Sequence, residues 1–155
     1  MKNIIKIAVL ILLANTLAIP VLSMSVQEDT RTIEITGLDN LKYDQTVIEA
    51  SPGETIKLVF KVVSNVPPQA MSHNIAILPQ DMDTDAFAMA SMMAADNEYI
   101  APEYEDDLIA YTEMIGGGET SIVEFTVPEE TGDYDFICTF PGHYQGGMVG
   151  ILRVK

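Results

Sequence analysis

The sequence predicts an all-β domain, a Greek-key β-sandwich interrupted by one short helical insertion around residues 82–96. Three observations predict this fold. Apolar residues alternate with polar ones in several short segments, turn signals separate these segments, and one Ala- and Met-rich segment departs from the alternation. A chain of 155 residues is also long enough to enclose one core.

The first part of the chain differs in composition from the rest. Two lysines precede an apolar stretch at residues 7–22, and small residues follow, which is the layout of a secretory signal. The stretch is short for the ~20 residues of a membrane-spanning helix, and Pro20 interrupts it. We therefore predict a signal peptide at residues 1–25, with a retained membrane anchor as the alternative, and a single domain at residues 26–155.

The predicted domain is strongly acidic. Residues 26–155 keep all 23 acidic residues and six basic ones, which leaves a formal charge of −17. Such a surface excludes nucleic-acid binding by neutralisation of phosphates. It is typical of a very soluble protein, and it would also steer the protein toward a basic partner. The export signal predicts a protein that is periplasmic or secreted, or membrane-tethered if residues 1–25 are retained, and we expect it to be a monomer.

Five segments after residue 30 have the two-residue period of strands with one wet face, which favours antiparallel pairing. They are residues 31–37, 54–63, 120–128, 133–138 and 150–155. Their expected inward side chains are Ile33, Ile35, Ile56, Leu58, Phe60, Val62, Val123, Phe125, Val127, Tyr134, Phe136, Cys138, Leu152 and Val154. A further strand is expected in "MSHNIAIL", and "SPGE", "NVPPQ" and "IGGGE" are turn signals.

The insertion is the segment "DMDTDAFAMASMMAADNEY" at residues 81–99. Asp83 or Asp85 is a candidate N-cap of a helix. Apolar residues then recur near helical spacing at Phe87, Met89, Met92 and Met93. We expect this methionine-lined face to pack on the core, and a soft Cu(I) site is the alternative.

The segment "FICTFPGHYQGGMVG" carries the candidate metal ligands. It holds the only cysteine, Cys138, followed by His143 and Met148 at Cys-x4-His-x4-Met spacing. Turn residues between them allow a tight loop that brings the three side chains together. The other histidine, His73, lies at the start of a predicted strand, whose end a sandwich can place beside this loop. Taken singly, a buried cysteine, a surface histidine and a core methionine are ordinary, but this spacing favours a joint role.

Two imidazoles, one thiolate and a weak thioether are the ligands of a His2Cys copper site with an axial methionine. A single cysteine excludes an internal disulfide and a two-copper centre with bridging cysteines. With three strong ligands in the chain, the usual four-ligand zinc sets cannot be assembled. Two histidines are too few for a multicopper oxidase, and a cysteine nucleophile would need an orienting third group.

These residues resemble those of the cupredoxins, and within that family the azurins and auracyanins. "CTFPGH" followed by Met148 resembles the azurin ligand loop, "MSHN" resembles the segment around the first histidine, and the likeness covers nearly all of residues 30–155. The resemblance implies one type 1 copper ion bound by His73, Cys138 and His143, with Met148 axial.

The resemblance also implies the surroundings of the copper. Asn74 would join the two ligand segments by hydrogen bonds, and a backbone amide near Phe140 would donate to the sulfur of Cys138. His143 would reach the surface within an apolar patch that includes Met71, Pro141, Gly146 and Gly147. Two departures are visible: Ser72 replaces the azurin glycine whose carbonyl approaches copper, and the azurin disulfide is missing.

We therefore predict a blue copper protein that carries single electrons and is not an enzyme. Its expected partners are redox proteins such as c-type cytochromes or membrane oxidases and reductases, possessing basic docking faces. One alternative is a copper carrier or storage protein that uses the Met-rich helix. Another is an electron-transfer module docked to a membrane oxidase through a retained anchor.

Overall fold

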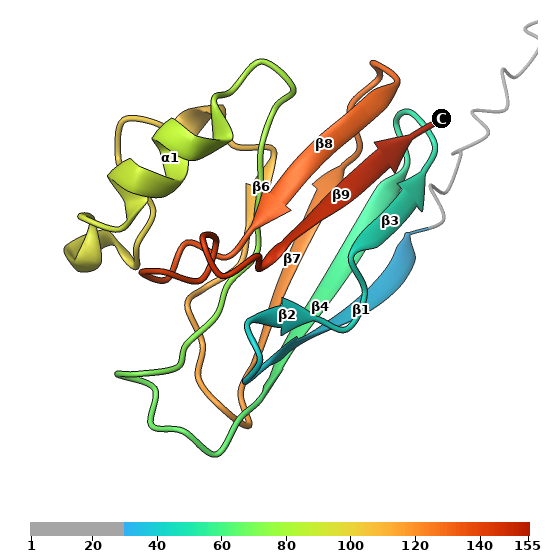
Figure 1. Cartoon of the computed structure of the whole chain (residues 1–155). Coiled ribbons are helices and arrows are strands. Elements are labelled where there is room, and N and C mark those ends of the chain that lie inside the picture. Colours follow the sequence, from blue (N-terminus) through green and yellow to red (C-terminus); the bar gives the residue numbers. More distant parts are fainter. Residues whose placement is uncertain (1–29) are drawn as a thin grey trace, which may run out of the picture.

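The computed structural model describes residues 30–155, which form a sandwich of two β-sheets with helical segments beside one of them (Figure 1). The first sheet has the order β2-β1-β4-β7 and the second β3-β9-β8-β5-β6. The strands of the first sheet are β1 (Arg31–Leu38), β2 (Lys42–Tyr43), β4 (Thr55–Val63) and β7 (Thr120–Thr126). Those of the second are β3 (Val47–Ala50), β5 (Ala76–Ile77), β6 (Ala110–Tyr111), β8 (Gly132–Ile137) and β9 (Val149–Val154).

This architecture confirms the predicted all-β Greek-key sandwich, because the chain passes repeatedly from one sheet to the other. The expectation of antiparallel pairing is wrong for two pairs. β1 lies parallel to β4, and β3 lies parallel to β9, while the other paired strands are antiparallel. Alternation shows which face of a strand is buried, but it carries no information on the direction of the neighbouring strand.

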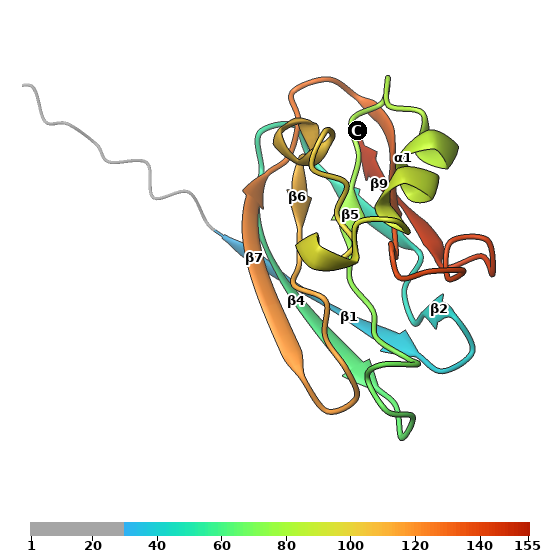
Figure 2. The same cartoon turned by 90° about the vertical axis from the view of Figure 1, so that its left-hand side faces the viewer.

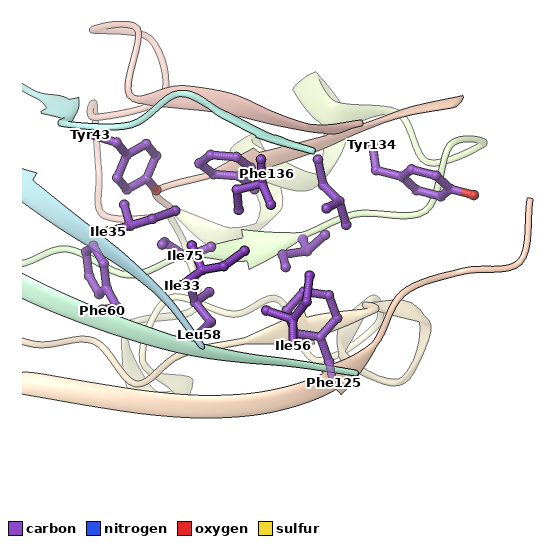
Figure 3. Packing of buried hydrophobic residues seen from close by; sticks show 14 of the residues in the cluster. Ile33, Ile35, Tyr43, Ile56, Leu58, Phe60, Ile75, Phe125, Tyr134 and Phe136 are labelled. Atoms are coloured by element: carbon purple, nitrogen blue, oxygen red, sulfur yellow. The ribbon is translucent and has the colours of Figure 1, made fainter. Parts of the chain in front are cut away.

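The core lies between the sheets and is built largely from the side chains that the alternation predicted. Along β4, Ile56, Leu58 and Phe60 are fully buried and Val62 nearly so. Figure 3 shows Phe136 and Tyr134 facing Phe60, Leu58, Ile56 and Phe125 across this space. At ~1.5–3 kcal/mol for each buried side chain, the inward face of β4 alone contributes about 6–12 kcal/mol of hydrophobic stabilisation, as an upper bound. Val123 is the exception, since it is only half-buried.

The predicted insertion is present as a short helix, α1 (Thr84–Ser91), followed by two 3-10 turns, η1 (Ala95–Asn97) and η2 (Glu105–Asp107). The carboxylate of Asp83 accepts a hydrogen bond from the Ala86 amide at 3.0 Å and caps the N-terminus of α1. Of the two candidate caps in the sequence, Asp83 and Asp85, the structure therefore uses Asp83. α1 packs on the outside of the second sheet beside β5 and β9 (Figure 2).

The expectation that a methionine-lined face of α1 packs on the core is wrong for two residues. Met89 is 63% exposed and Met93 is 86% exposed. Phe87 is buried as expected and Met92 is half-buried, but Ala88 and Ser91 take the place of the two exposed methionines on the buried face. Small side chains let the helix approach the sheet closely, and the helical period then turns Met89 toward solvent. Met93 lies beyond the end of α1, in the turn that follows Ser91.

The predicted signal peptide or anchor at residues 1–25 lies outside the described residues. Within residues 30–155, no helix is both long and apolar enough to cross a membrane.

Candidate metal centre

Three donor atoms from two distant segments of the chain converge between the sheets. The Nδ1 atoms of His73 and His143 lie 3.0 Å apart, and the Sγ atom of Cys138 lies 3.8 Å and 3.5 Å from them, respectively. For donors held ~2.0–2.3 Å from a central ion in a trigonal arrangement, the donor–donor distances are about 3.5–3.9 Å. The two sulfur–nitrogen distances lie within this range, and the two nitrogen atoms would have to move apart by about 0.5 Å, so the triangle fits a single first-row metal ion with a small adjustment.

His73 is positioned by backbone hydrogen bonds and by packing. Its amide donates to the carbonyl of Ile115 at 2.9 Å, and the Ile115 amide donates back at 3.0 Å. Its ring lies so close to Gly37 that a Cβ added there would stand 3.2 Å from Cδ2. The buried Nε2 atom has no hydrogen-bond partner among the described residues, so contacts on the ring, rather than a bond to Nε2, orient Nδ1 toward the other donors.

The loop between β8 and β9 positions the other predicted ligands (red in Figure 1). Cys138 directly follows β8, and its amide donates to the carbonyl of Met148 at 3.2 Å. The Met148 amide donates to the carbonyl of His143 at 3.0 Å. Gly142 and Gly147 have φ angles of 83° and 86°, which a side chain would disfavour. Met148 is fully buried in the same apolar cluster as Cys138.

A buried hydrogen-bond network joins the two ligand segments. The Oδ1 atom of Asn74 accepts from the Thr139 amide at 2.9 Å, and its Nδ2 atom donates to Thr139 Oγ1, also at 2.9 Å. Asn74 is completely buried and Thr139 is 1% exposed. Because each follows a predicted ligand directly, their pairing fixes His73 relative to Cys138.

Burial controls the protonation of the three donors in the metal-free protein. It raises the pKa of the Cys138 thiol to about 12, although the backbone amides of Asn74 and Phe140 donate to the sulfur and oppose the rise. Burial, with a smaller effect of His143, lowers the pKa of His73 to about 4. Burial also lowers the pKa of His143. At neutral pH the imidazoles are therefore uncharged and ready to bind a cation, and a bound cation would displace the thiol proton.

The two histidines differ in their access to solvent. His73 is fully buried, whereas His143 keeps 4% of its surface exposed. The neighbouring Pro141 is exposed, and the ring of Phe140 lies 4.7 Å from that of His143. The Tyr99 ring, from the segment after η1, lies 5.3 Å from the Phe140 ring. The edge of His143 is thus the point at which the candidate site approaches the surface.

The structure describes both departures from the azurin pattern, Ser72 in place of glycine and the missing disulfide. The hydroxyl of Ser72 donates to the carbonyl of Pro68 at 2.8 Å, so its side chain serves the preceding turn. Cys138 is a free, buried cysteine.

The structure brings together the three strong ligands that the sequence predicted, and it buries Met148 in the same apolar cluster as Cys138. It also shows contacts that sequence reasoning missed: those of Gly37, Lys42, Tyr43 and Thr139. Thr139 lies within the quoted loop motif and could have been proposed as the partner of Asn74. The others lie far from both motifs in the sequence, and no local pattern indicates that they reach the site.

Comparison with known proteins agrees with this geometry. Azurin from Alcaligenes faecalis is 31% identical over 115 residues, which cover 72% of this chain and 89% of that protein. Auracyanin-B from Chloroflexus aurantiacus is 32% identical over 126 residues, which cover 80% of this chain but only 52% of that protein. The solved structure of reduced auracyanin from Roseiflexus castenholzii is 34% identical, with a TM-score of 0.71, over 80% of this chain and 96% of that one.

A family model described as copper binding proteins of the plastocyanin/azurin family matches residues 30–155. The chain therefore belongs to this family of copper-binding cupredoxins, with His73, Cys138 and His143 positioned to bind the metal ion.

Proposed function

We propose that this protein carries single electrons between extracytoplasmic redox proteins and transforms no substrate of its own. His73, Cys138 and His143 would be the strong ligands of one copper ion, and Met148 a weak axial ligand. The observation that carries the proposal is the buried triangle of two Nδ1 atoms and one Sγ atom. When bound there, copper would supply a one-electron couple between Cu(II) and Cu(I).

The protein's own contribution would be to keep the ligands in one arrangement in both oxidation states. Imidazole is a preferred ligand of Cu(II) and sulfur a preferred ligand of Cu(I). A site with both therefore has a coordination that is intermediate between the preferences of the two oxidation states. The Asn74–Thr139 network and the packing of the sheets resist rearrangement of the donors. Little nuclear movement would then accompany the electron, which favours fast transfer.

Electrons would enter and leave through the edge of His143, because this ligand alone among the three strong ones keeps measurable exposure. The exposed residues beside it, Pro141, Gly142 and Gly146, would let a partner approach closely. We propose a monomer that meets c-type cytochromes or membrane oxidases and reductases in the periplasm or outside the cell. Tethering to a membrane would apply if residues 1–25 are retained.

A spectrum tests the copper site. The copper-loaded protein should be intensely blue in the Cu(II) state, should lose this colour on reduction and should regain it on oxidation. Cys138→Ser removes the thiolate and should abolish the visible charge-transfer band, whereas Ser72→Gly should keep it because the side chain of Ser72 points to Pro68. A colourless copper-loaded protein, or a blue Cys138→Ser variant, would contradict the proposal.

A second candidate function is copper carriage or storage, and the exposure of Met89 and Met93 favours it. Met89 lies in α1 and Met93 lies two residues beyond its end, so both exposed thioethers belong to one short stretch of chain, and thioethers bind Cu(I). Titration with Cu(I) separates the two functions. One bound ion with reversible redox cycling supports the electron carrier. Further ions that are lost in a Met89→Leu/Met93→Leu variant support the copper carrier.

A further inference from the structure

The short strand β2 and the residue before it reach the candidate copper site from the first sheet. We call Leu41, Lys42 and Tyr43 the brace. β2 pairs with the end of β1, where Tyr43 lies opposite Gly37. Leu41 has a φ of 57°, which is uncommon for leucine, and its amide donates to the carbonyl of Leu38 at 3.1 Å. The tight turn directs the three side chains of the brace toward the ligand segments.

Tyr43 contacts the segment that carries His73. Its hydroxyl donates to the backbone carbonyl of Asn74 at 2.7 Å, and the side chain is 96% buried. Its ring lies 5.2 Å from that of Phe136 and 6.0 Å from that of Phe60, so it is held by both sheets. This hydrogen bond therefore connects the peptide after His73 to a rigid part of the core.

Lys42 contacts the loop that carries His143 and Met148. Its ammonium donates to the carbonyls of Gly147 at 2.8 Å and Gly146 at 3.1 Å. These are the last two carbonyls before Met148, while the amides of the same glycines bond within the loop. A cation that donates to two adjacent carbonyls adds a restraint from outside the loop to a glycine pair whose own residues restrict the backbone little.

The use of Lys42 is distinctive in so acidic a protein. Four of the six basic residues in the described part of the chain pair with carboxylates, namely Arg31, Lys61, Arg153 and Lys155. The ammonium of Lys42 instead donates hydrogen bonds to backbone carbonyls of the ligand loop. Leu41 adds an apolar contact there, since a Cβ added to Gly146 would stand 2.7 Å from Leu41 Cδ1.

We infer that the brace positions the copper ligands, with Lys42 holding the His143–Met148 loop and Tyr43 holding the His73 segment. This inference rests on the proposed copper function. Neither residue would touch the metal, so both are positioning residues that act through the backbone. Without them the loop would sample more conformations, and the ligand arrangement would be less uniform.

The test compares matched variants. Lys42→Met removes the ammonium, Lys42→Arg retains a cationic donor, and Lys57→Met removes the same charge from the outer face of β4. Amide exchange at Met148 in the copper-free protein should be about fivefold faster in Lys42→Met, as expected for the loss of a modest hydrogen-bond contribution. Copper release should accelerate by a similar factor, and the EPR spectrum of the Cu(II) form should change. Lys42→Arg should restore all three properties.

A second pair tests the tyrosine. Tyr43→Phe and Tyr134→Phe each remove a hydroxyl that donates to a backbone carbonyl at 2.7 Å. Figure 3 places the two rings at opposite ends of the core. We expect faster copper release from Tyr43→Phe alone.

The inference is overturned for the loop if Lys42→Met matches Lys57→Met in amide exchange and in the EPR spectrum. It is overturned for the His73 segment if Tyr43→Phe releases copper no faster than Tyr134→Phe. A wild-type protein without a charge-transfer band and a reversible one-electron couple would instead overturn the proposed function. Because amide exchange is measured without copper, it still decides whether Lys42 holds the loop.

Discussion

The hydrogen-bonded pair of Asn74 and Thr139 makes the strongest prediction about stability. Asn74→Leu keeps nearly the same volume but removes both polar groups of the side chain. The Thr139 amide then loses its acceptor and Thr139 Oγ1 loses its partner, and both groups are buried. An unsatisfied buried polar group costs ~1–3 kcal/mol, so the variant should lose about 2–6 kcal/mol of unfolding free energy.

Urea denaturation of the copper-free protein measures this loss without a contribution from metal binding. Thr112→Val is a matched control, because Thr112 Oγ1 accepts one buried hydrogen bond, from the Ile75 amide at 3.0 Å. It should cost about 1–3 kcal/mol. In a double-mutant cycle, Asn74→Leu and Thr139→Val should be coupled by about 0.5–3 kcal/mol. Additive effects, or a loss below ~1 kcal/mol for Asn74→Leu, would refute the reasoning.

Three further predictions follow from the site and the surface. Gly37→Ala would place a Cβ 3.0 Å from Phe60 Cζ and 3.2 Å from His73 Cδ2. The variant should lose about 1–3 kcal/mol of unfolding free energy and should shift the visible band of the copper-loaded protein. An unchanged spectrum would contradict the role of Gly37. In the copper-free protein, the folded pKa of His73 is about 4 against ~6.5 when unfolded, so the unfolded state binds more protons between these values. The contribution of neutral His73 to the unfolding free energy is therefore fully present above about pH 6.5 and should fall by about 2 kcal/mol between pH 7 and pH 5. An unfolding free energy that stays constant in urea titrations across this pH range would disprove it. Finally, electron transfer to a basic c-type cytochrome should slow by roughly tenfold or more as salt rises to physiological strength, and a rate indifferent to salt would exclude steering by the acidic surface.

Much of the fold could be predicted because its information is local. The alternation in β4 identifies four inward side chains, and all four are buried. The Cys138–Met148 spacing likewise describes a loop whose turn residues lie between the ligands. Where a two-residue period or a set of turn glycines is enough to define an element, the sequence prediction and the structure agree.

The rest depends on contacts between distant segments. β2 has only two residues and no periodicity to detect, although its Tyr43 and Lys42 reach both ligand segments. The parallel pairing of β1 with β4 is decided by how the chain crosses between sheets. Met89 and Met93 had the right spacing for a buried face, but Phe87 and two small residues fit the sheet more closely.

The two ends of the described domain, Arg31 and Lys155, lie close together and far from the exposed edge of His143. Arg31 Nη2 donates to the carbonyl of Glu49 at 2.7 Å, and Lys155 pairs with the carboxylate of Glu49. Gly37, which touches His73, lies six residues further along β1, or about 20 Å away at the rise of a strand. An electrode surface or fusion partner joined near Arg31 or Lys155 would therefore leave the exposed edge of His143 accessible, and both points of attachment should give the same orientation.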